Sequence, residues 1–337
     1  MDGADVSGSG STAAVVIGRN EGARLGDSLR SVQQAGLPLV YVDSGSVDGS
    51  VALAQNLGAR VVKLDPARPF SAARARNEGL AEAQQVVSDL EYVLFLDGDC
   101  VLDEIFPAAA AESLDEDGNI AIVVGHLSER SPNASIYNRL CAIEWRSPAG
   151  RIDDFAALGG IMLARVSAVR QVGGFNEQVI AGEDSELGVR LRLAGHAVVK
   201  IDKPMAVHDA EIRRFSQWWR RAVRGGHALA QRHSLNGGSE LQDCRREYRS
   251  TLFWGLIVPL AVVLLLLPTR GLSLLLLGGY FVLGYRVFGH YRKTGLSAGD
   301  ALLAARFILY SKFANMLGVI QFWLNRQRGK FQIIEYK

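Results

Sequence analysis

The chain has 337 residues, with 37 Lys and Arg against 35 Asp and Glu, and 48% of its residues are hydrophobic. This composition is too apolar and too evenly charged for a disordered chain, and nine Pro with 36 Gly in no three-residue period exclude a collagen-like fibre. Three Cys cannot form a disulfide framework, and their odd number favours reduced thiols in a protein that faces the cytosol. Globular domains therefore remain, with room for a membrane part.

The N-terminal segment carries no recognisable export signal. Residues 1–12 are rich in Gly and Ser, and they include Asp2 and Asp5. A secretory signal needs a basic start and an apolar core, and this segment has neither. We expect a flexible leader here, and we expect residues 13–249 to stay on the cytoplasmic side of a membrane.

Short apolar runs then alternate with helical patterns. The runs have strand length and are rich in β-branched or aromatic residues, and the stretches between them have helical length and spacing. The predicted strands are 13–17, 40–43, 60–63 and 92–97, with a later one at 197–201, and the predicted helices are 25–35, 50–57 and 72–83. This order predicts parallel strands with right-handed crossovers, and therefore a Rossmann-like, mostly parallel α/β sheet.

Polar residues follow all four of the first predicted strands. They are residues 18–21 (GRNE), 43–50 (DSGSVDGS), 70–79 (FSAARARNEG) and 97–99 (DGD). In open α/β sheets, ligands bind at the carboxyl ends of the strands. Helix capping would explain Asp48 or Ser50 alone, but it does not explain all four sites together. The pattern predicts a ligand site at this edge.

Asp97 and Asp99 give the sharpest chemical signal in this set. Two carboxylates at positions i and i+2 of a turn can reach one divalent cation, and Gly98 between them allows close backbone approach. Oxygen ligands of this kind suit Mg²⁺ or Mn²⁺ bound to phosphates. The chain has neither a P-loop motif nor G-x-G-x-x-G, which argues against a P-loop nucleotidase and a dinucleotide cofactor.

Seven motifs carry a family resemblance. They are VVIGRNE, VDSGSVDGS, ARNEG, LFLDGDC, GGIML, GGFNE and GEDSELGVRLRLAGH, in this order. Together they resemble the family-2 glycosyltransferases with a GT-A fold, over roughly residues 13–225. The resemblance implies a nucleoside diphosphate-sugar donor and a divalent cation, Mg²⁺ or Mn²⁺.

The resemblance also implies roles for individual residues. On the donor side, Glu21, Asp43 and Ser46 would hold the nucleoside, Arg74 or Arg76 would approach the diphosphate or base, and Asn77 would brace the loop. Asp97 and Asp99 would bind the metal and diphosphate, and His208 would be a third metal ligand, although an isolated His is more often a packed or surface residue. On the acceptor or diphosphate side, the candidates are Gly159, Gly160, Gln217, Trp218, Trp219 and Arg220.

The pair Glu183 and Asp184 opens a predicted helix that runs to Gly195. The resemblance implies that Asp184, with Glu183 beside it, is the general base that takes the proton from an acceptor hydroxyl. One base and one metal site suit a single inverting displacement. The alternative is that Asp184 caps this helix, and the two roles are compatible.

A strongly basic segment follows. Residues 217–221 (QWWRR) resemble the Q-x-x-R-W element of processive synthases, but Arg221 stands where the Trp would be, which argues against processivity. Residues 212–250 carry nine Arg and no Lys against three acidic residues. An anionic membrane surface attracts such a segment by about 1 kcal/mol per basic residue, and a lipid-linked diphosphate is an alternative partner. Because the positive charge is confined to this stretch, a nucleic-acid role is not supported.

The excess of apolar residues lies near the C-terminus. Residues 252–268 and 271–285 contain no charge, with Arg270 between them, and each run is near the lower limit for crossing a bilayer. Basic residues flank both runs, so the positive-inside rule places both ends in the cytoplasm. We expect a transmembrane or re-entrant hairpin at 251–288, with a buried soluble hairpin as the alternative. Residues 301–324 are interrupted by Arg306, Lys312 and Asn315, and they predict an interfacial amphipathic helix before a basic tail.

The expected organisation is a leader (1–12), a GT-A domain (13–225), a basic juxtamembrane segment (226–250), the hairpin (251–288), and an interfacial helix with a basic tail (289–337). The expected function is metal-dependent, inverting sugar transfer to a hydroxyl of a lipid-linked or cell-surface saccharide. Two alternatives are a polyprenyl-phosphate acceptor and a catalytically dead membrane scaffold. The presence of Asp97, Asp99 and Asp184 argues against the dead scaffold.

Overall fold

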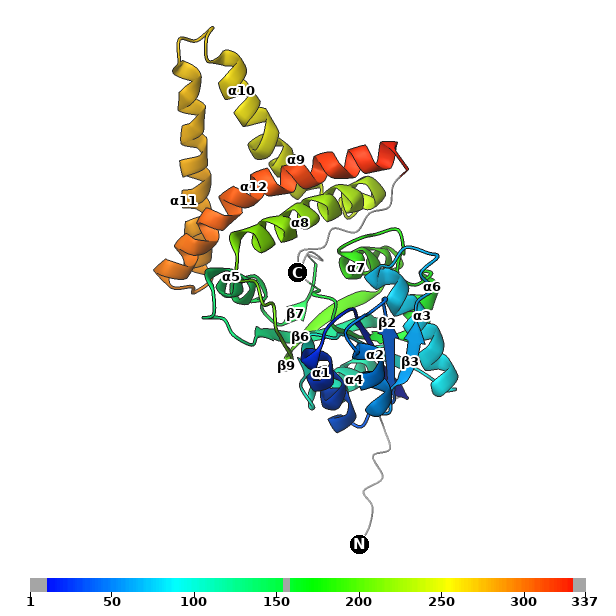
Figure 1. Cartoon of the computed structure of the whole chain (residues 1–337). Coiled ribbons are helices and arrows are strands. Elements are labelled where there is room, and N and C mark those ends of the chain that lie inside the picture. The colour runs from blue at the N-terminus through cyan, green and yellow to red at the C-terminus, as the bar shows by residue number, and fades with distance from the viewer. Residues whose placement is uncertain (1–10, 154–157, 330–337) are drawn as a thin grey trace. The chain divides into compact units, whose positions relative to one another are not determined.

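The computed structural model describes residues 11–153 and 158–329, which form two compact units (Figure 1). The sheet unit comprises the described residues up to 130 together with 145–210. The helical unit comprises 131–144 and the described residues from 211 onward. Residues 1–10 of the predicted leader and 330–337 of the predicted basic tail lie outside the described residues.

The sheet unit is built on one sheet, whose strand order is β3-β2-β1-β4-β8-β6-β9-β5, with β7 paired to β9. The strands are β1 (Thr12–Gly18), β2 (Leu39–Asp43), β3 (Arg60–Lys63), β4 (Tyr92–Asp97), β5 (Cys100–Leu102), β6 (Ile120–Glu129), β7 (Gly150–Arg151), β8 (Met162–Arg165) and β9 (Ala197–His208). The first four strands pair in parallel, as their alternation with helices predicts. The predicted α/β fold is confirmed.

The rest of the sheet is mixed rather than mostly parallel. Strand β8 runs antiparallel to β4 and β6, and β9 runs parallel to β6 but antiparallel to β5. Strand β9 is also longer than the predicted strand at 197–201, so His208 is its last residue rather than part of a following loop. As a result, His208 is fixed by strand pairing on both sides.

Helices of the sheet unit pack against this sheet. They are α1 (Ala23–Gln34), α2 (Ser50–Asn56), α3 (Ala72–Val86), α4 (Phe106–Glu116), α6 (Val166–Gln171) and α7 (Glu183–Leu193). Helix α3 approaches β1 and β2 so closely that a Cβ atom on Gly79 would lie 2.3 Å from Cγ1 of Val15. The glycine of the ARNEG motif therefore sets how close α3, with Arg74 and Arg76 in its first turns, lies to the sheet.

The helical unit contains α5 (Ile136–Glu144), α8 (Phe215–Asn236), α9 (Arg245–Leu252), a π-helical segment η2 (Phe253–Ile257), α10 (Val258–Leu265), a 3₁₀ segment η3 (Leu272–Leu277), α11 (Gly278–Lys293) and α12 (Ala298–Gln327). Helices α8 and α12 lie side by side (Figure 1). The predicted domain boundary at residue 225 falls inside α8, and the helical unit resumes at residue 211. The basic segment thus spans α8, the turn after it and most of α9.

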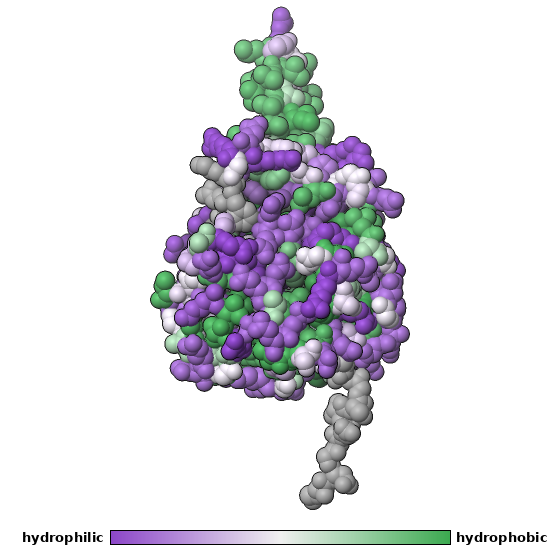
Figure 2. Space-filling view, turned by 90° about the vertical axis from the view of Figure 1, so that its right-hand side faces the viewer, coloured by the Kyte–Doolittle hydropathy of each residue, from purple (hydrophilic) through white to green (hydrophobic). Residues whose placement is uncertain are grey.

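Within the described residues, three helices are long and apolar enough to cross a membrane: Arg245–Leu265, Leu272–Lys293 and Ala298–Gln327. The first two form the predicted hairpin, over which apolar side chains gather in Figure 2. The third is the predicted interfacial helix. Its apolar window is 39% buried, against 6% for Leu272–Lys293, because α12 packs along α8. Its placement at a membrane interface stays a prediction.

Candidate active site

The loops after β1 and β2 are joined by hydrogen bonds. The amide of Asn20 donates to Oγ of Ser46 over 2.9 Å, and the Asn20 side chain in turn accepts from the amide of Val47. Asp43 is buried, and its Oδ2 accepts from the amides of Gly45 and Ser46, both over 3.0 Å. The carboxylate of Asp43 therefore shapes the turn in which Ser46 lies.

Glu21 lies in the loop after β1, with Oε2 3.1 Å from a guanidinium nitrogen of Arg24. Arg24 is in the first turn of α1, so the pair connects this loop to its own helix. The side chains predicted to hold the nucleoside, Glu21, Asp43 and Ser46, thus come from the two joined loops. Their role toward a nucleoside stays a prediction.

Arg74 makes structural contacts within the sheet unit, and its predicted approach to a diphosphate or base stays a prediction. Its guanidinium is buried, and it donates to Glu78 over 2.7 Å and to the carbonyl oxygens of Asp65 and Arg68, each over 3.0 Å. These bonds tie the loop before α3 to the start of the helix. The sequence alone cannot distinguish this arginine from Arg76, because the two lie only two residues apart.

Arg76 joins three segments of the sheet unit. It is only 1% exposed, its Nη2 donates to Asp97 over 2.7 Å and to the carbonyl oxygen of Gly160 over 3.2 Å, and its Nη1 donates to Glu183. Burial disfavours the charged guanidinium, but Asp97, Glu183 and Asp184 offset this effect and raise the pKa of Arg76. Arg76 therefore holds two carboxylates together, and its predicted approach to a diphosphate or base stays a prediction.

Asn77, the next residue, holds the loop that contains the GGFNE motif. Its Nδ2 donates to the carbonyl oxygen of Phe175 over 2.8 Å, and its Oδ1 accepts from the amide of Phe175 over 2.9 Å. Gly174 has φ 73°, and a Cβ atom there would lie 2.8 Å from Oδ1 of Asn77. A glycine is required at this position both by its conformation and by the closeness of Asn77.

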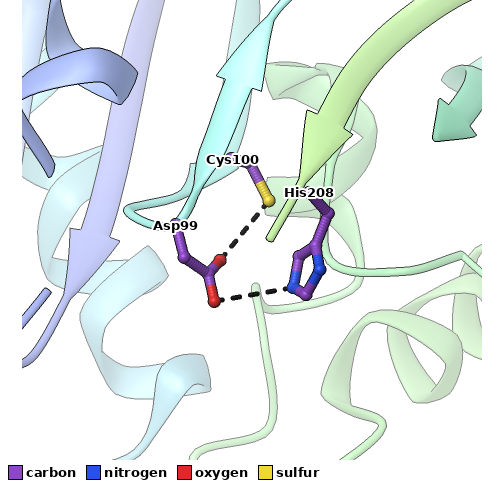
Figure 3. Close-up of side chains that lie close together, drawn as sticks. All are labelled: Asp99, Cys100 and His208. Atoms are coloured by element: carbon purple, nitrogen blue, oxygen red, sulfur yellow. Dashed lines mark hydrogen bonds and ion pairs between the residues drawn. The ribbon is translucent and has the colours of Figure 1, made fainter. Parts of the chain in front are cut away.

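Asp99, Cys100 and His208 converge at the ends of β5 and β9. One potential ligand atom from each lies within 4.8 Å of the others, and Nε2 of His208 is 3.5 Å from Oδ2 of Asp99 (Figure 3). The predicted pair Asp99 and His208 is therefore brought together. Asp97 lies outside this cluster of described residues, with its Oδ1 bound to Arg76.

Cys100 was not among the predicted site residues. Its Sγ lies 3.4 Å from Oδ1 of Asp99, and the side chain is buried. Antiparallel pairing places it directly opposite His208. The sequence signal for Cys100 was weak because a cysteine next to a D-x-D motif is also an ordinary core residue.

Glu183 and Asp184 form the first turn of α7. The helix begins after Gly182, whose φ of 72° is left-handed, and no side chain caps it. Asp184 is 7% exposed, and its Oδ2 accepts from the amide of Gly160 over 2.9 Å. Burial and the neighbouring carboxylate of Glu183 raise the pKa of Asp184, and Arg76 acts in the opposite direction.

Gly160 lies between the candidate base and the Arg76 network. It has φ 77°, and a Cβ atom on it would lie 2.7 Å from Nη2 of Arg76 and 3.0 Å from Oδ2 of Asp97. Its neighbour Gly159 also has a left-handed backbone, with φ 74°. Since the amide of Gly160 binds Asp184 and its carbonyl binds Arg76, the GGIML loop connects both sides of the site.

The candidates of the QWWRR element lie in α8 of the helical unit, not in the sheet unit. Oε1 of Gln217 accepts from the amides of Arg213 and Arg214, both over 3.0 Å, and so caps α8. Trp218 packs edge-on against Phe307. Trp219 and Arg220 contact residues of the same helical turn, Phe215 and Ser216. Within the helical unit these side chains start and anchor α8, and an acceptor role stays a prediction.

Comparison with known proteins identifies this domain. Residues 14–170 match the model of glycosyl transferase family 2. This part of the chain is therefore similar to the family-2 glycosyltransferases. The matched residues include Asp97, Asp99 and Gly160, whereas Asp184 and His208 lie beyond them.

Two curated relatives match part of the chain. The poly-β-1,6-N-acetyl-D-glucosamine synthase of Staphylococcus epidermidis is 27% identical over 194 residues, covering 53% of this chain and 45% of that protein. The succinoglycan biosynthesis protein ExoA of Rhizobium meliloti is 25% identical over 193 residues, covering 54% and 56%. The chain thus spans about half the length of the curated relatives that it matches.

A solved structure shares the GT-A fold. The mannosyltransferase PcManGT from Pyrobaculum calidifontis, in complex with GDP-Man and Mn²⁺, superposes with a TM-score of 0.61 at 16% identity, covering 95% of this chain and 89% of that one. At this identity the likeness shows the fold alone. This fold agrees with the mixed α/β sheet of the sheet unit.

Proposed function

We propose that this protein transfers a sugar from a nucleoside diphosphate-sugar to a hydroxyl group of a lipid-linked or cell-surface saccharide, with inversion, at the cytoplasmic face of a membrane. The observation that carries the proposal is the Arg76 network. It joins Asp97 at the end of β4 to Glu183 at the start of α7, next to the candidate base Asp184, so that a donor-side carboxylate and the candidate base lie around one buried guanidinium. The named roles of the relatives, in poly-N-acetylglucosamine and succinoglycan synthesis, support a saccharide product.

Asp184 has the environment that a general base needs. Its raised pKa makes the carboxylate a stronger proton acceptor than an exposed aspartate, and the amide of Gly160 fixes its orientation. The acceptor O–H proton would pass to Asp184 while the acceptor oxygen bonds to the anomeric carbon. The bond from that carbon to the diphosphate oxygen breaks, and the electron pair leaves with the nucleoside diphosphate. One displacement of this kind inverts the anomeric centre.

The residues present fit a divalent cation. Asp99 offers oxygen and His208 offers an imidazole nitrogen, which suit Mn²⁺, and Asp99 alone offers the hard oxygen that Mg²⁺ prefers. Cys100 contacts Asp99 and would support its carboxylate rather than complete a thiolate site. When bound, the cation would neutralise negative charge on the leaving diphosphate. The PcManGT structure, which holds Mn²⁺ with GDP-Man, supports this assignment.

The helical unit supplies the membrane part of the proposal. Three of its helices can span a bilayer by length and composition, and residues 212–250 carry nine Arg. Basic residues on both flanks of the hairpin favour a cytoplasmic location for both of its ends. An anionic membrane surface would attract these basic residues. We infer that the acceptor is presented at this surface, which suits a lipid-linked saccharide.

A transfer assay with two acceptor classes tests the proposal. The full-length protein, reconstituted in vesicles, is offered UDP-, GDP- and dTDP-sugars with Mn²⁺, and with either a saccharide acceptor or a polyprenyl phosphate. Asp184→Asn should lower transfer to the saccharide hydroxyl by about 10²–10⁴-fold, since general base catalysis typically contributes this much. Asp202→Asn, a change on the exposed side of β9, is the matched control and should transfer normally.

The two acceptor classes separate the outcomes. A phosphate oxygen hardly needs a base, so activity of Asp184→Asn toward polyprenyl phosphate alone would select the lipid-phosphate alternative. Full activity of Asp184→Asn toward a saccharide hydroxyl would overturn the assignment of the base. Failure of the wild-type protein to transfer any of these sugars would overturn the proposed function and favour a binding scaffold.

A further inference from the structure

Glu129, a buried carboxylate at the end of β6, faces His208 from the side opposite to Asp99. The register of the sheet explains this placement. His208 is paired with Cys100 of β5 on one side and with Glu129 of β6 on the other. Three neighbouring strand ends therefore bring Asp99, His208 and Glu129 into one row.

The two ring nitrogens of His208 face two different carboxylates. Nε2 lies 3.5 Å from Oδ2 of Asp99, whereas Nδ1 lies 3.9 Å from Oε2 of Glu129. Nδ1 is buried and has no hydrogen-bond partner within the part of the chain that the structure describes. A buried polar nitrogen without a partner is costly, so a small rotation of the ring toward Glu129 would be favourable.

Glu129 is itself held in place. Its side chain is fully buried, and Oε2 accepts from the amide of Ala210 over 3.2 Å. Trp145 packs edge-on against the His208 ring, with 4.8 Å between ring centres, and so limits its rotation. The carboxylate and the indole together restrict the directions in which His208 can point.

We propose that Glu129 is a positioning residue for the metal site. Its carboxylate accepts a hydrogen bond from the Nδ1–H group of His208, which leaves Nε2 free to bind a divalent cation beside Asp99. This inference rests on the metal site of the proposed function. Histidine ligands usually donate their second ring N–H to a carboxylate or carbonyl, which fixes the tautomer and raises ligand basicity. Glu129 is the carboxylate in that place, and no sequence motif marks it.

The role of Glu129 can be tested by measuring Mn²⁺ binding to the full chain in detergent. The electron paramagnetic resonance signal of free Mn²⁺ gives the affinity directly. Glu129→Gln keeps the shape and can still accept from Ala210, but its carboxylate charge is lost. We expect Mn²⁺ affinity to fall roughly 10- to 100-fold. Glu129→Asp keeps the charge at a shorter reach and should lose less. The control is Asp202→Asn, which removes the carboxylate that lies 2.8 Å from His126 on the same strand pair and should bind Mn²⁺ normally.

A double-mutant cycle with His208→Ala separates positioning from a general structural effect. If Glu129 acts through His208, Glu129→Gln should have almost no further effect on Mn²⁺ affinity once the imidazole is absent. An equal loss in both backgrounds would overturn the positioning role, as would wild-type affinity of Glu129→Gln beside a clear loss in Asp99→Asn. Glu129→Asp supplies the same cycle should Glu129→Gln fail to fold. No Mn²⁺ binding by the wild-type protein would overturn the metal site itself, and the role of Glu129 with it.

Discussion

The two units of this protein use buried charge in different ways. In the helical unit, Arg232 donates two hydrogen bonds of 3.1 and 2.6 Å to Asp243, and both side chains are only 7% exposed. In the sheet unit, Arg76 is shared between Asp97 and Glu183, and Asp184 lies beside them with a raised pKa.

This difference separates structural charge from functional charge. A pair of this kind neutralises both charges and holds the turn before α9 against α8. A cluster with more carboxylates than guanidinium groups has excess negative charge. The binding of a cation or of a proton would lower the repulsion between its carboxylates. Buried carboxylates with a raised pKa gather at functional sites, where a carboxylate has to take up a proton or a cation.

The largest expected effect comes from removing the shared guanidinium. Arg76→Met leaves Asp97 and Glu183 without their common partner, and breaking a buried pair in this way costs about 3–5 kcal/mol of stability. Transfer activity of the folded fraction should also fall, because the strand end and α7 lose their link. Thermal unfolding of the detergent-solubilised protein and a transfer assay at low temperature measure the two effects.

Arg232→Met is the matched variant in the helical unit. The substitution leaves the Asp243 carboxylate without its guanidinium partner, again at a cost of about 3–5 kcal/mol of stability. The unfolding temperature should fall by as much as in Arg76→Met, or by less. The folded fraction should keep wild-type kcat. Equal losses of kcat in both variants would contradict the distinction between structural and functional charge.

Asp184→Asn should change activity and stability in opposite directions. Because the folded state raises the pKa of Asp184, the folded protein holds a proton there more tightly than the unfolded chain does, whose aspartates titrate near about 3.9. The stabilising contribution of Asp184 is therefore present below that value and is lost as the pH rises through the folded-state pKa. At neutral pH the neutral asparagine avoids this cost, and its unfolding temperature should equal or exceed that of the wild type.

The pH dependence provides the check on this prediction. The stability advantage of Asp184→Asn over wild type should grow as the pH rises from about 4 toward 7, because only the wild type must ionise a buried carboxylate. Unfolding temperatures measured across this range give the sign directly. An advantage that shrinks with rising pH would show that the ionised carboxylate is stabilised, so that Arg76 outweighs burial.

The first half of the fold was predictable because its signals are local. The first four observed strands, β1 to β4, agree within one residue at each end with the predicted strands 13–17, 40–43, 60–63 and 92–97. Apolar runs define these strands, and glycines end the helices between them. The strands β5, β7 and β8 were missed because two to four residues carry too little periodicity, and the ten-residue strand β6 was missed as well. The mixed half of the sheet therefore emerged only from long-range pairing.

The candidate site shows the same division. Asp99 and Asp184 were found because motifs mark them, and the structure buries both. The contacts of Arg74 and Arg76 were not predictable, because two residues along a helix decide which guanidinium meets Asp65 and which meets Asp97. Glu129 was missed for a related reason. Its importance arises from strand register opposite His208, which a single sequence does not reveal.

A smaller loss of stability is expected from substituting two glycines at which a helix packs closely against a neighbouring element. A Cβ atom on Gly318 in α12 would lie 2.0 Å from the backbone oxygen of Val223, whereas one on Gly79 in α3 would meet the side chain of Val15. A side chain can shift and a helix backbone cannot, so Gly318→Ala should cost more than Gly79→Ala, with both in the range of about 1–3 kcal/mol. Gly299→Ala, whose nearest atom is 3.9 Å away, should instead stabilise α12 slightly. Unfolding temperatures rank the three variants, and a larger loss for Gly79→Ala would contradict the argument.

The smallest effect concerns a paired charge at the surface of the helical unit. Arg139 and Asp300 make two hydrogen bonds of 2.8 and 2.7 Å, a geometry like that of Arg232 and Asp243, but the side chains are 34% and 14% exposed. Water screens such a pair, so Asp300→Asn should cost only about 0.5–1 kcal/mol, including the loss of an acidic residue from the first turn of α12. The difference in unfolding temperature from wild type should shrink in 0.5 M salt, roughly the range in which surface pairs are screened. The Arg232→Met difference should persist in the same salt, because that pair is buried. If salt abolished both differences, burial would not be what distinguishes the two pairs.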